Sequence, residues 1–384
     1  MSKNIIHVKS HNYFLGFDEA TGSLHVQAGV LLSEILDVFV EKGWFLTVTP
    51  GTKLVTVGGV IASDVHGKNH HVLGCFSECV TQIALMLADG QTIQCSRAEN
   101  ADFFRATCGG MGLTGVILDA TIVLSRIPSA RIEQTTIKTR NLKETFDSFE
   151  KYRNQPYSVA WIDCLAKGDD LGRCLLNAGD FADDGSLDYR SRTPWTVPFN
   201  APSFALNSLT VRSFNRLYYK MAREGVSHQT VDLDSFFYPL DSIRHWNRLY
   251  GKSGFTQYQF VLPKETSFDG LEEVLGTIAA EGKGSFLAVL KLFGKANDNF
   301  LSFPTEGYTL ALDFKIEPGL FKLLDKLDLI VTRQGGRIYL AKDARVRREI
   351  FEKGYPGIEA FRSLRAEHKM NLKFNSLQSR RVGI

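Results

Sequence analysis

The stretch VGGVIASDVHGKNHH, residues 57–71, limits what the chain can fold into more than any other part of its sequence. It holds three glycines, three histidines, one lysine and one aspartate. Glycine disfavours the interior of a helix and lets a backbone approach a ligand closely. Because the stretch follows the strand-like run LVTV, it predicts a turn after a strand, and no helix is expected through His66 and His70.

Three interpretations of this stretch follow from its residue types. A metal site would need His66 and His70 on one helix face, and Lys68 between them would repel a cation, so this interpretation is disfavoured. Gly58 and Gly59 would instead turn backbone N–H groups toward an anion, and a second turn, GGMGLTG, would do the same. Neither turn is a dinucleotide fingerprint or a P-loop, so the pattern leaves cofactor binding and a purely structural turn both open.

The flanking sequence predicts a mixed fold for the first part of the chain. LHVQAGV alternates like a strand, and LLSEILDVFVEKG has helical spacing up to Gly43, a helix-ending residue. Asp89-Gly90 lies between two apolar runs and predicts a hairpin. A short helix, the second glycine-rich turn and a long strand are expected over residues 100–127.

Beyond residue 128 the pattern predicts an antiparallel sheet with helices on one face, which makes the fold class α+β. Strands are expected within 157–165, 256–263, 285–293 and 308–314, and helices within 267–282 and 319–336. Residues 181–230 are less regular and suggest a long insertion or a mobile cover. The predicted organisation is a cofactor domain over 1–128, a substrate domain over 129–336 and a return to the first domain over 337–384.

Composition excludes some classes of protein. The net charge of +3 comes without a long basic run, so nucleic acid is not an expected partner. The N-terminus lacks the pattern of a signal peptide, and no segment has the length and apolarity of a membrane span, so a cytoplasmic location is expected. The six cysteines predict reduced and mostly buried thiols.

Several segments together resemble a known family. TPGTKLVTVGGVIASDVHGKNHH, LMLADG and GGMGLTGVI are similar to the FAD-binding domain of the vanillyl-alcohol oxidase superfamily, and within it to the decaprenylphosphoryl-β-D-ribose 2′-oxidase family. The resemblance continues through FYPLDSIRHWNRLYGKSGFTQYQFVLP, SFLAVLKLFG, FLSFP and GGRIYLAKDAR. It implies a two-domain flavoprotein with an FAD domain and an antiparallel-sheet substrate domain.

The resemblance also implies residues that contact FAD. These are Pro50, Gly51, Thr52, Thr56, Val57, Gly58, Gly59, Ser63, Asp64, Val65, His66, Gly67, Ile117 and Tyr339. The family's FAD domain begins with a further segment that carries a GxGxSYGD-like loop, which this sequence lacks. We therefore expect an N-terminally truncated FAD domain, either from a misassigned start codon or as a relic.

The substrate site implied by the resemblance lies mainly on the predicted strands. Gln257 and Gln259 alternate with Tyr258 and Phe260, so the two glutamines share a strand face. Lys291 in an apolar strand would be costly unless it met an acid or a ligand anion, and a surface salt bridge is the alternative for Lys291 and Lys342. The implied catalytic set is Lys342, His66 and Lys291, and the implied substrate set is Lys68, Trp161, Gln257, Gln259, Lys291, Phe293 and Ala311.

Two positions depart from the family pattern. Ala311 stands where inhibitor-sensitive members have a cysteine, so the chain is expected to resist thiol-directed inhibitors. Phe237 replaces a tyrosine, which would remove a hydroxyl from the edge of the pocket.

The implied reaction is oxidation of a secondary sugar hydroxyl, C2 of a polyprenyl-phosphate-linked ribose, to the keto sugar. An NAD(P)H-dependent short-chain reductase would complete the epimerisation, and a quinone-like acceptor or oxygen would reoxidise FAD. The family implies contact with the inner membrane surface. The alternatives are an aldonolactone or sugar-alcohol oxidase and an inactive remnant that serves only as a binding module.

Overall fold

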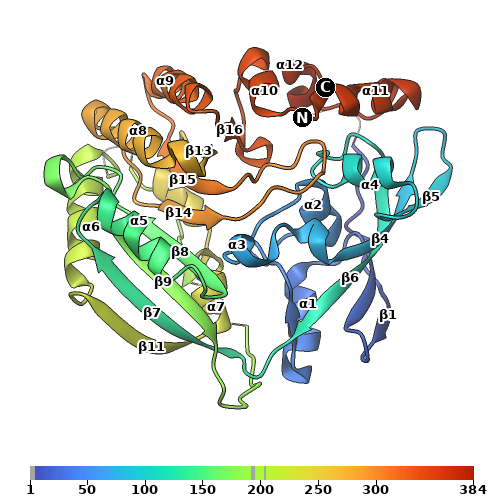
Figure 1. Cartoon of the computed structure of the whole chain (residues 1–384), viewed down its shortest axis with the longest axis horizontal. Coiled ribbons are helices and arrows are strands. Elements are labelled where there is room, and N and C mark those ends of the chain that lie inside the picture. The colour runs from blue at the N-terminus through green and yellow to red at the C-terminus, as the bar shows by residue number, and fades with distance from the viewer. Residues whose placement is uncertain (1–4, 192–194, 203–204) are drawn as a thin grey trace.

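Two β-sheets stand side by side in the computed structural model, which describes residues 5–191, 195–202 and 205–384 (Figure 1). The first sheet has the order β1-β2-β6-β4-β5, with β3 also paired to β6. Its strands are β1 Phe14–Asp18, β2 Ser23–Gln27, β3 Trp44–Leu46, β4 Val80–Met86, β5 Thr92–Cys95 and β6 Val116–Arg126. The helices of this half are α1 Leu32–Phe39, α2 Val57–Ala62, α3 His70–Leu73 and α4 Ala101–Thr107.

The local predictions for this half are confirmed around α1 and the hairpin. The buried residues of α1 are Leu32, Ile35, Leu36 and Phe39, the spacing of a single helix face. A 3₁₀ turn extends the helix to Gly43, whose φ of 77° is the left-handed conformation that ends helices. β4 and β5 form the hairpin, with Gly90 at φ 92° in its turn.

The second sheet is the antiparallel sheet that the sequence predicts. Its order is β11-β7-β9-β8-β14-β15-β13-β16, and every neighbouring pair is antiparallel. Its strands are β7 Arg131–Thr139, β8 Tyr157–Ile162, β9 Cys174–Phe181, β11 Val226–Asp232, β13 Phe255–Pro263, β14 Ala288–Phe293, β15 Gly307–Lys315 and β16 Arg337–Ile338. The covering helices are α5 Leu142–Lys151, α8 Ser267–Glu281 and α9 Leu320–Arg333.

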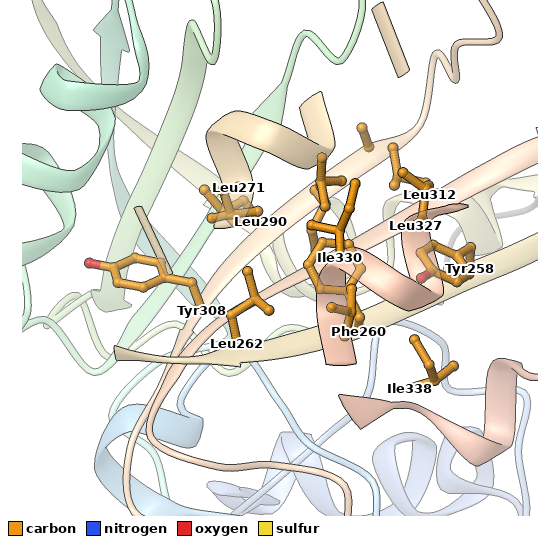
Figure 2. Close-up of a cluster of buried hydrophobic side chains, with 14 of the residues drawn as sticks. Tyr258, Phe260, Leu262, Leu271, Leu290, Tyr308, Leu312, Leu327, Ile330 and Ile338 are labelled. Carbon is orange, nitrogen blue, oxygen red and sulfur yellow. The ribbon is translucent and has the colours of Figure 1, made fainter. Parts of the chain in front are cut away.

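The core between this sheet and its helices explains why the other sheet face is available for a site. Figure 2 shows Tyr258 and Phe260 of β13 among apolar side chains of β14, β15, α8 and α9. Each fully buried side chain of this kind contributes about 1.5–3 kcal/mol. Because side chains alternate along a strand, Gln257 and Gln259 lie on the opposite face, as predicted.

The prediction of a strand and a turn at Gly58 is wrong, whereas the expectation that no helix carries both His66 and His70 is confirmed. Gly58 and Gly59 lie in the first turn of α2, and Thr56 caps this helix by accepting a hydrogen bond from the N–H of Gly59 at 3.2 Å. Val57, Val60 and Ile61 provide its buried face. A buried apolar face and a cap therefore outweigh the low helix propensity of two glycines.

The region 181–230 is more regular than its sequence suggests. It contains α6 Ser208–Met221 and β11, while residues 192–194 and 203–204 lie outside the described part. β10 Trp195–Thr196 and β12 Ile243–Arg244 form a small parallel pair, and α7 Leu233–Phe237 follows β11. β11 is an edge strand with largely exposed polar residues, so it lacks the alternation by which strands are recognised.

The tail from 337 follows the predicted order of strand and then helices. α10 Arg348–Gly354, α11 Ile358–Glu367 and α12 Leu377–Val382 lie along the top of Figure 1 and extend over the first sheet's half. The guanidinium of Arg365 donates from Nε to the Leu113 carbonyl at 3.0 Å, and His368 packs on Phe103 with ring centroids 4.7 Å apart. None of the helices in the described ranges is long and apolar enough to cross a bilayer.

Candidate flavin and substrate site

The strand register gathers the expected substrate residues on the sheet face that α8 and α9 leave uncovered. Trp161 pairs with Val289, which pairs with Ala311, which pairs with Gln259. Directly opposed residues of antiparallel strands point to the same face. Lys291 lies two residues beyond Val289 and therefore shares this face.

His66 enters this surface from the first half of the chain. Its ring lies 4.7 Å from the Phe293 ring, 5.3 Å from Tyr339 and 5.7 Å from Phe303, measured between centroids. Its Nε2 is 3.0 Å from Nε2 of Gln259. Burial lowers the pKa of His66 well below its usual value, and the charge of Lys291 lowers it further, so the imidazole is neutral.

The hydrogen bonds around Gln259 assign the tautomer of His66. Thr309 donates its hydroxyl to the Phe260 carbonyl at 2.7 Å, so it accepts from the Gln259 amide at 3.2 Å. The other amide hydrogen of Gln259 then points at Nε2 of His66, which must accept it. The proton of His66 is therefore on Nδ1, a buried atom with no partner among the described residues.

Three lysines surround this position, and none of them forms a salt bridge with a described residue. Burial lowers the pKa of Lys291 to about 8 and that of Lys68 to about 7. Burial also lowers the pKa of Lys342, whose ammonium donates to Oε1 of Gln257 at 2.7 Å. Lys291 has no hydrogen-bond acceptor in the described part of the chain, so the surface salt bridges considered for Lys291 and Lys342 are absent.

Asp313 belongs to this site, although it was not among the residues expected from the sequence. Its Oδ1 accepts from the Gln257 amide at 2.8 Å, while Oδ2 is buried and lacks a partner in the described structure. Burial raises the pKa of Asp313 to about 6. The available signal was alternation, because Asp313 is two residues beyond Ala311 and must share its strand face.

The expectation that the first glycine-rich turn presents free N–H groups to an anion is wrong. The N–H groups of Val57 and Gly58 donate to the carbonyls of Val30 and Ala28 at 2.9 and 2.8 Å. In the second turn, Gly109 and Met111 donate to carbonyls at the end of α2, at 3.0 and 2.8 Å. The two turns therefore hold α2 in place.

The other expected cofactor residues fall into two groups. Several side chains are already engaged within the protein: Thr52 donates to Asp241 at 2.8 Å, Thr56 caps α2, and the carboxylate of Asp64 is buried among side-chain donors. Val57, Gly67 and Ile117 are also buried. The remaining expected residues are partly or fully exposed or border His66: Pro50, Gly51, Gly58, Gly59, Ser63, Val65 and Tyr339, whose hydroxyl donates to the Ser63 carbonyl at 3.1 Å.

Two residues lie deeper than expected. Phe237 is 1% exposed and packs against Phe45 and Tyr157, so it is a core residue, and the idea that it borders a pocket is wrong. Lys68 donates to the carbonyl of Phe236 and lies 4.5 Å from the centroid of that ring. Its ammonium is therefore held by α7, within electrostatic reach of Lys291.

The donor set fits the ring system of a flavin. That ring presents carbonyl and nitrogen acceptors along one edge and gains negative charge on reduction, which protein donors and cations stabilise. The site offers the unpartnered Nδ1–H of His66, whose ring lies next to those of Phe293 and Tyr339. It also offers the ammonium of Lys291, which has no hydrogen-bond partner in the described part of the chain.

Comparison with known proteins defines the class. A family model described as an FAD binding domain matches residues 3–96. The chain is 24% identical to L-gulonolactone oxidase of Mus musculus, over 94% of this chain and 81% of that protein. With the two-sheet α+β fold, these similarities define an FAD-dependent oxidoreductase of the vanillyl-alcohol oxidase superfamily.

A narrower similarity gives the family. The chain is 36% identical to decaprenylphosphoryl-beta-D-ribose oxidase of Mycolicibacterium smegmatis, over 98% of this chain and 84% of that protein. It is 30% identical to an uncharacterized protein of Streptomyces coelicolor, over 92% of this chain and the full length of that protein. The chain belongs to the decaprenylphosphoryl-β-D-ribose oxidase family.

Proposed function

We propose that this chain oxidises C2 of a polyprenyl-phosphate-linked ribose to the keto sugar, the first half of an epimerisation. The observation that carries the proposal is the group of Lys68, Lys291 and Lys342, which are half-buried and form no salt bridge with any described residue. Cations that lose water without gaining a counter-charge are costly, and an anionic substrate group offsets that cost. A phosphate attached to a hydroxylated sugar supplies both the negative charge and the hydrogen-bonding groups.

The structure supports different roles for His66 and Lys342. His66 Nε2 already accepts from Gln259, so the imidazole acts as a donor through Nδ1 and does not take a proton. Burial shifts Lys342 toward its neutral amine, which can accept the hydroxyl proton. We therefore assign the base to Lys342, sugar binding to Gln257 and Gln259, and the anchoring charge to Lys291.

FAD, when bound, supplies the oxidising chemistry by accepting two electrons and the hydrogen of the carbon that carries the hydroxyl. A quinone-like acceptor or oxygen regenerates it, and an NAD(P)H-dependent short-chain reductase then acts on the keto sugar. We propose that the chain works in the cytoplasm, in peripheral contact with the inner membrane surface, where a lipid-linked substrate is within reach.

The first test is the visible absorption spectrum of the purified chain, followed by anaerobic mixing with a substrate. Stoichiometric FAD that is bleached by a synthetic polyprenylphosphoryl ribose, and not by L-gulono-1,4-lactone, is the expected result. Bleaching by the lactone alone would favour a lactone oxidase. A chain that stays colourless with added FAD would contradict the proposal and favour a binding module.

Lys342→Met tests the base. We expect about 10²–10⁴-fold slower flavin reduction with FAD still bound, because a positioned base contributes a factor of this size. Lys322→Met, on the exposed side of α9, is the matched control and should reduce at the wild-type rate. If the flavin of Lys342→Met were reduced at the wild-type rate, a group other than Lys342 would be the base that accepts the hydroxyl proton.

A further inference from the structure

The exposed side of α6 is unusual for a helix of a water-soluble surface. Only Val211 and Asn215 are buried, whereas Leu217 is 60% and Met221 is 75% exposed. Phe214 and Tyr218 are also exposed. The helix lies at the left margin of Figure 1, on the outer side of the second sheet. Its apolar residues therefore face outward, where a core-packed helix would carry polar ones.

The outward residues of α6 divide into an apolar face and a basic face. Phe214, Leu217, Tyr218 and Met221 have the i, i+3, i+4, i+7 spacing of one face. Arg212, Arg216 and Lys220 follow at i, i+4, i+8 on the neighbouring face. The helix contains no acidic residue, so both faces combine on one element with a charge of +3.

The basic face is unpaired throughout the described ranges. Arg212, Arg216 and Lys220 are exposed and form no ion pair there. The exposed helix α9 behaves differently, because its Lys326 and Arg333 pair with Glu281 and Glu273 of α8. The charge of α6 is thus available to an external anion.

The apolar face is continuous with the candidate substrate site. Tyr218 packs edge-on against Trp161 with ring centroids 4.8 Å apart, and Trp161 lies on the sheet face that carries Gln259 and Lys291. Phe214 stacks on Tyr218 and meets Phe286, whose carbonyl accepts from the Trp161 indole at 3.0 Å. A molecule covering α6 would therefore lie beside one wall of the site.

We propose that α6 is an interfacial helix that docks the enzyme on an anionic membrane, with its apolar face inserted and its basic face against lipid phosphates. An apolar face bordered by Lys and Arg is the arrangement of helices that lie in the plane of a bilayer surface. Charge complementarity favours this occupant over a second copy of the chain, whose α6 would bring the same positive charge. The inference rests on the proposed function, because a lipid-linked substrate must be taken from a bilayer.

The test is co-sedimentation of the FAD-loaded chain with vesicles of phosphatidylcholine, alone or mixed with phosphatidylglycerol. Binding should require the anionic lipid and weaken with salt. Arg212→Gln/Arg216→Gln/Lys220→Gln should lower partitioning by on the order of a hundredfold, since each basic residue contributes about fivefold. Leu217→Glu/Met221→Glu should lower it by at least about tenfold.

Matched substitutions on α9 serve as controls. Phe321 is 47% and Leu329 is 61% exposed, so Phe321→Glu/Leu329→Glu adds the same charges to another exposed helix and should bind vesicles nearly as wild type. The arginine and lysine variant decides the question even if the glutamate variant does not fold. Equal vesicle binding by all variants would overturn the proposal, and so would vesicle binding that does not depend on salt. The proposal would also fail if the wild-type chain bound no vesicles and instead formed a dimer that Leu217→Glu/Met221→Glu dissociates.

The outcome is separable from that of the proposed function. Vesicle binding through α6 by a chain that does not oxidise the lipid-linked ribose would refute only the proposed reaction. Oxidation of that substrate without α6-dependent vesicle binding would refute only the docking role.

Discussion

At the scale of single residues, the unusual feature of the site is a buried acid, Asp313, that lies near Lys342 without contacting it directly. Asp313 reaches Lys342 only through Gln257, whose amide donates to the acid and accepts from the ammonium. The carboxylate thereby fixes the orientation of the amide, which positions the lysine that we assign as the base.

Asp313→Asn should change how stability depends on pH. The pKa of Asp313 is about 6 in the folded chain, above its ordinary value of 3.8, so the folded state holds the proton more tightly. Wild type therefore loses stability as pH rises from about 4 to about 6, by roughly 2–3 kcal/mol, and the asparagine variant does not. As pH rises through this range, the free energy of unfolding in urea should increase by that amount for the variant relative to wild type. A difference between the two that stays constant with pH would contradict this.

Ala311→Cys should create a reactive thiol where wild type has none. All six native cysteines are buried, and burial raises the pKa of each thiol, which suppresses the nucleophilic thiolate. Ala311 is only half-buried, on the site's face of the sheet. Intact-mass spectrometry after mild iodoacetamide treatment should show one adduct on the variant and none on native wild type. An adduct on wild type would contradict the expected resistance to thiol-directed inhibitors.

At the scale of elements, the glycine-rich turns serve the packing of α2. Gly58 faces Ala28 so closely that a Cβ on residue 58 would lie 2.9 Å from the Cβ of Ala28. Gly109 and Met111 bond the other end of the same short helix. α2 is therefore fixed at both ends, and this fixes the start of the segment that carries His66.

Gly58→Ala and Gly51→Ala form a matched pair that tests this packing. Gly58→Ala should lower the free energy of unfolding by about 1–3 kcal/mol, because the new methyl group overpacks a site bounded by backbone. A Cβ at Gly51 meets nothing within 4 Å, so Gly51→Ala should stay within about 0.5 kcal/mol of wild type. Urea unfolding of the FAD-free chain measures both, and equal effects would contradict the packing role.

At the scale of the whole molecule, one buried carboxylate joins the two halves. Asp64 follows α2 and accepts from Asn297, Asn299 and Ser302, all in the β14–β15 loop, at 2.9, 2.9 and 2.7 Å. It also accepts from the N–H of Ser77 at 3.1 Å. Since His66 is two residues away, this contact fixes the histidine against the second sheet.

Asp64→Asn should weaken that joint. The amide nitrogen cannot accept the hydrogen bonds that a carboxylate oxygen receives, so we expect a loss of about 2–3 kcal/mol in the free energy of unfolding and weaker FAD binding. Asp119→Asn is the control, since the side chain of its partner His25 is 45% exposed and the loss should stay below about 1 kcal/mol. Flavin fluorescence titration and urea unfolding measure the two effects, and parity between the variants would refute the role.

The sequence predicted those parts of the fold that local periodicity specifies. Alternation in TQYQF placed the two glutamines opposite Tyr258 and Phe260, and the spacing in residues 319–336 located α9. The local pattern did not predict α2, because tertiary burial there outweighs the low helix propensity of glycine. It also did not predict most of residues 208–232, because these exposed elements lack the apolar periodicity of a core. Residue types and the family resemblance named most residues of the candidate site, but they did not name Asp313.

What the sequence determined by itself is the α+β class, the two strand faces and the family, because these follow from residue types at fixed local spacing. Only the tertiary structure decided which polar groups remain free. The N–H groups of Val57 and Gly58 donate to the carbonyls of Val30 and Ala28, respectively, while Lys291 and Nδ1 of His66 have no partner in the described structure. The physical reason is that a hydrogen bond is satisfied by whatever long-range packing brings within about 3 Å, and no local pattern encodes that.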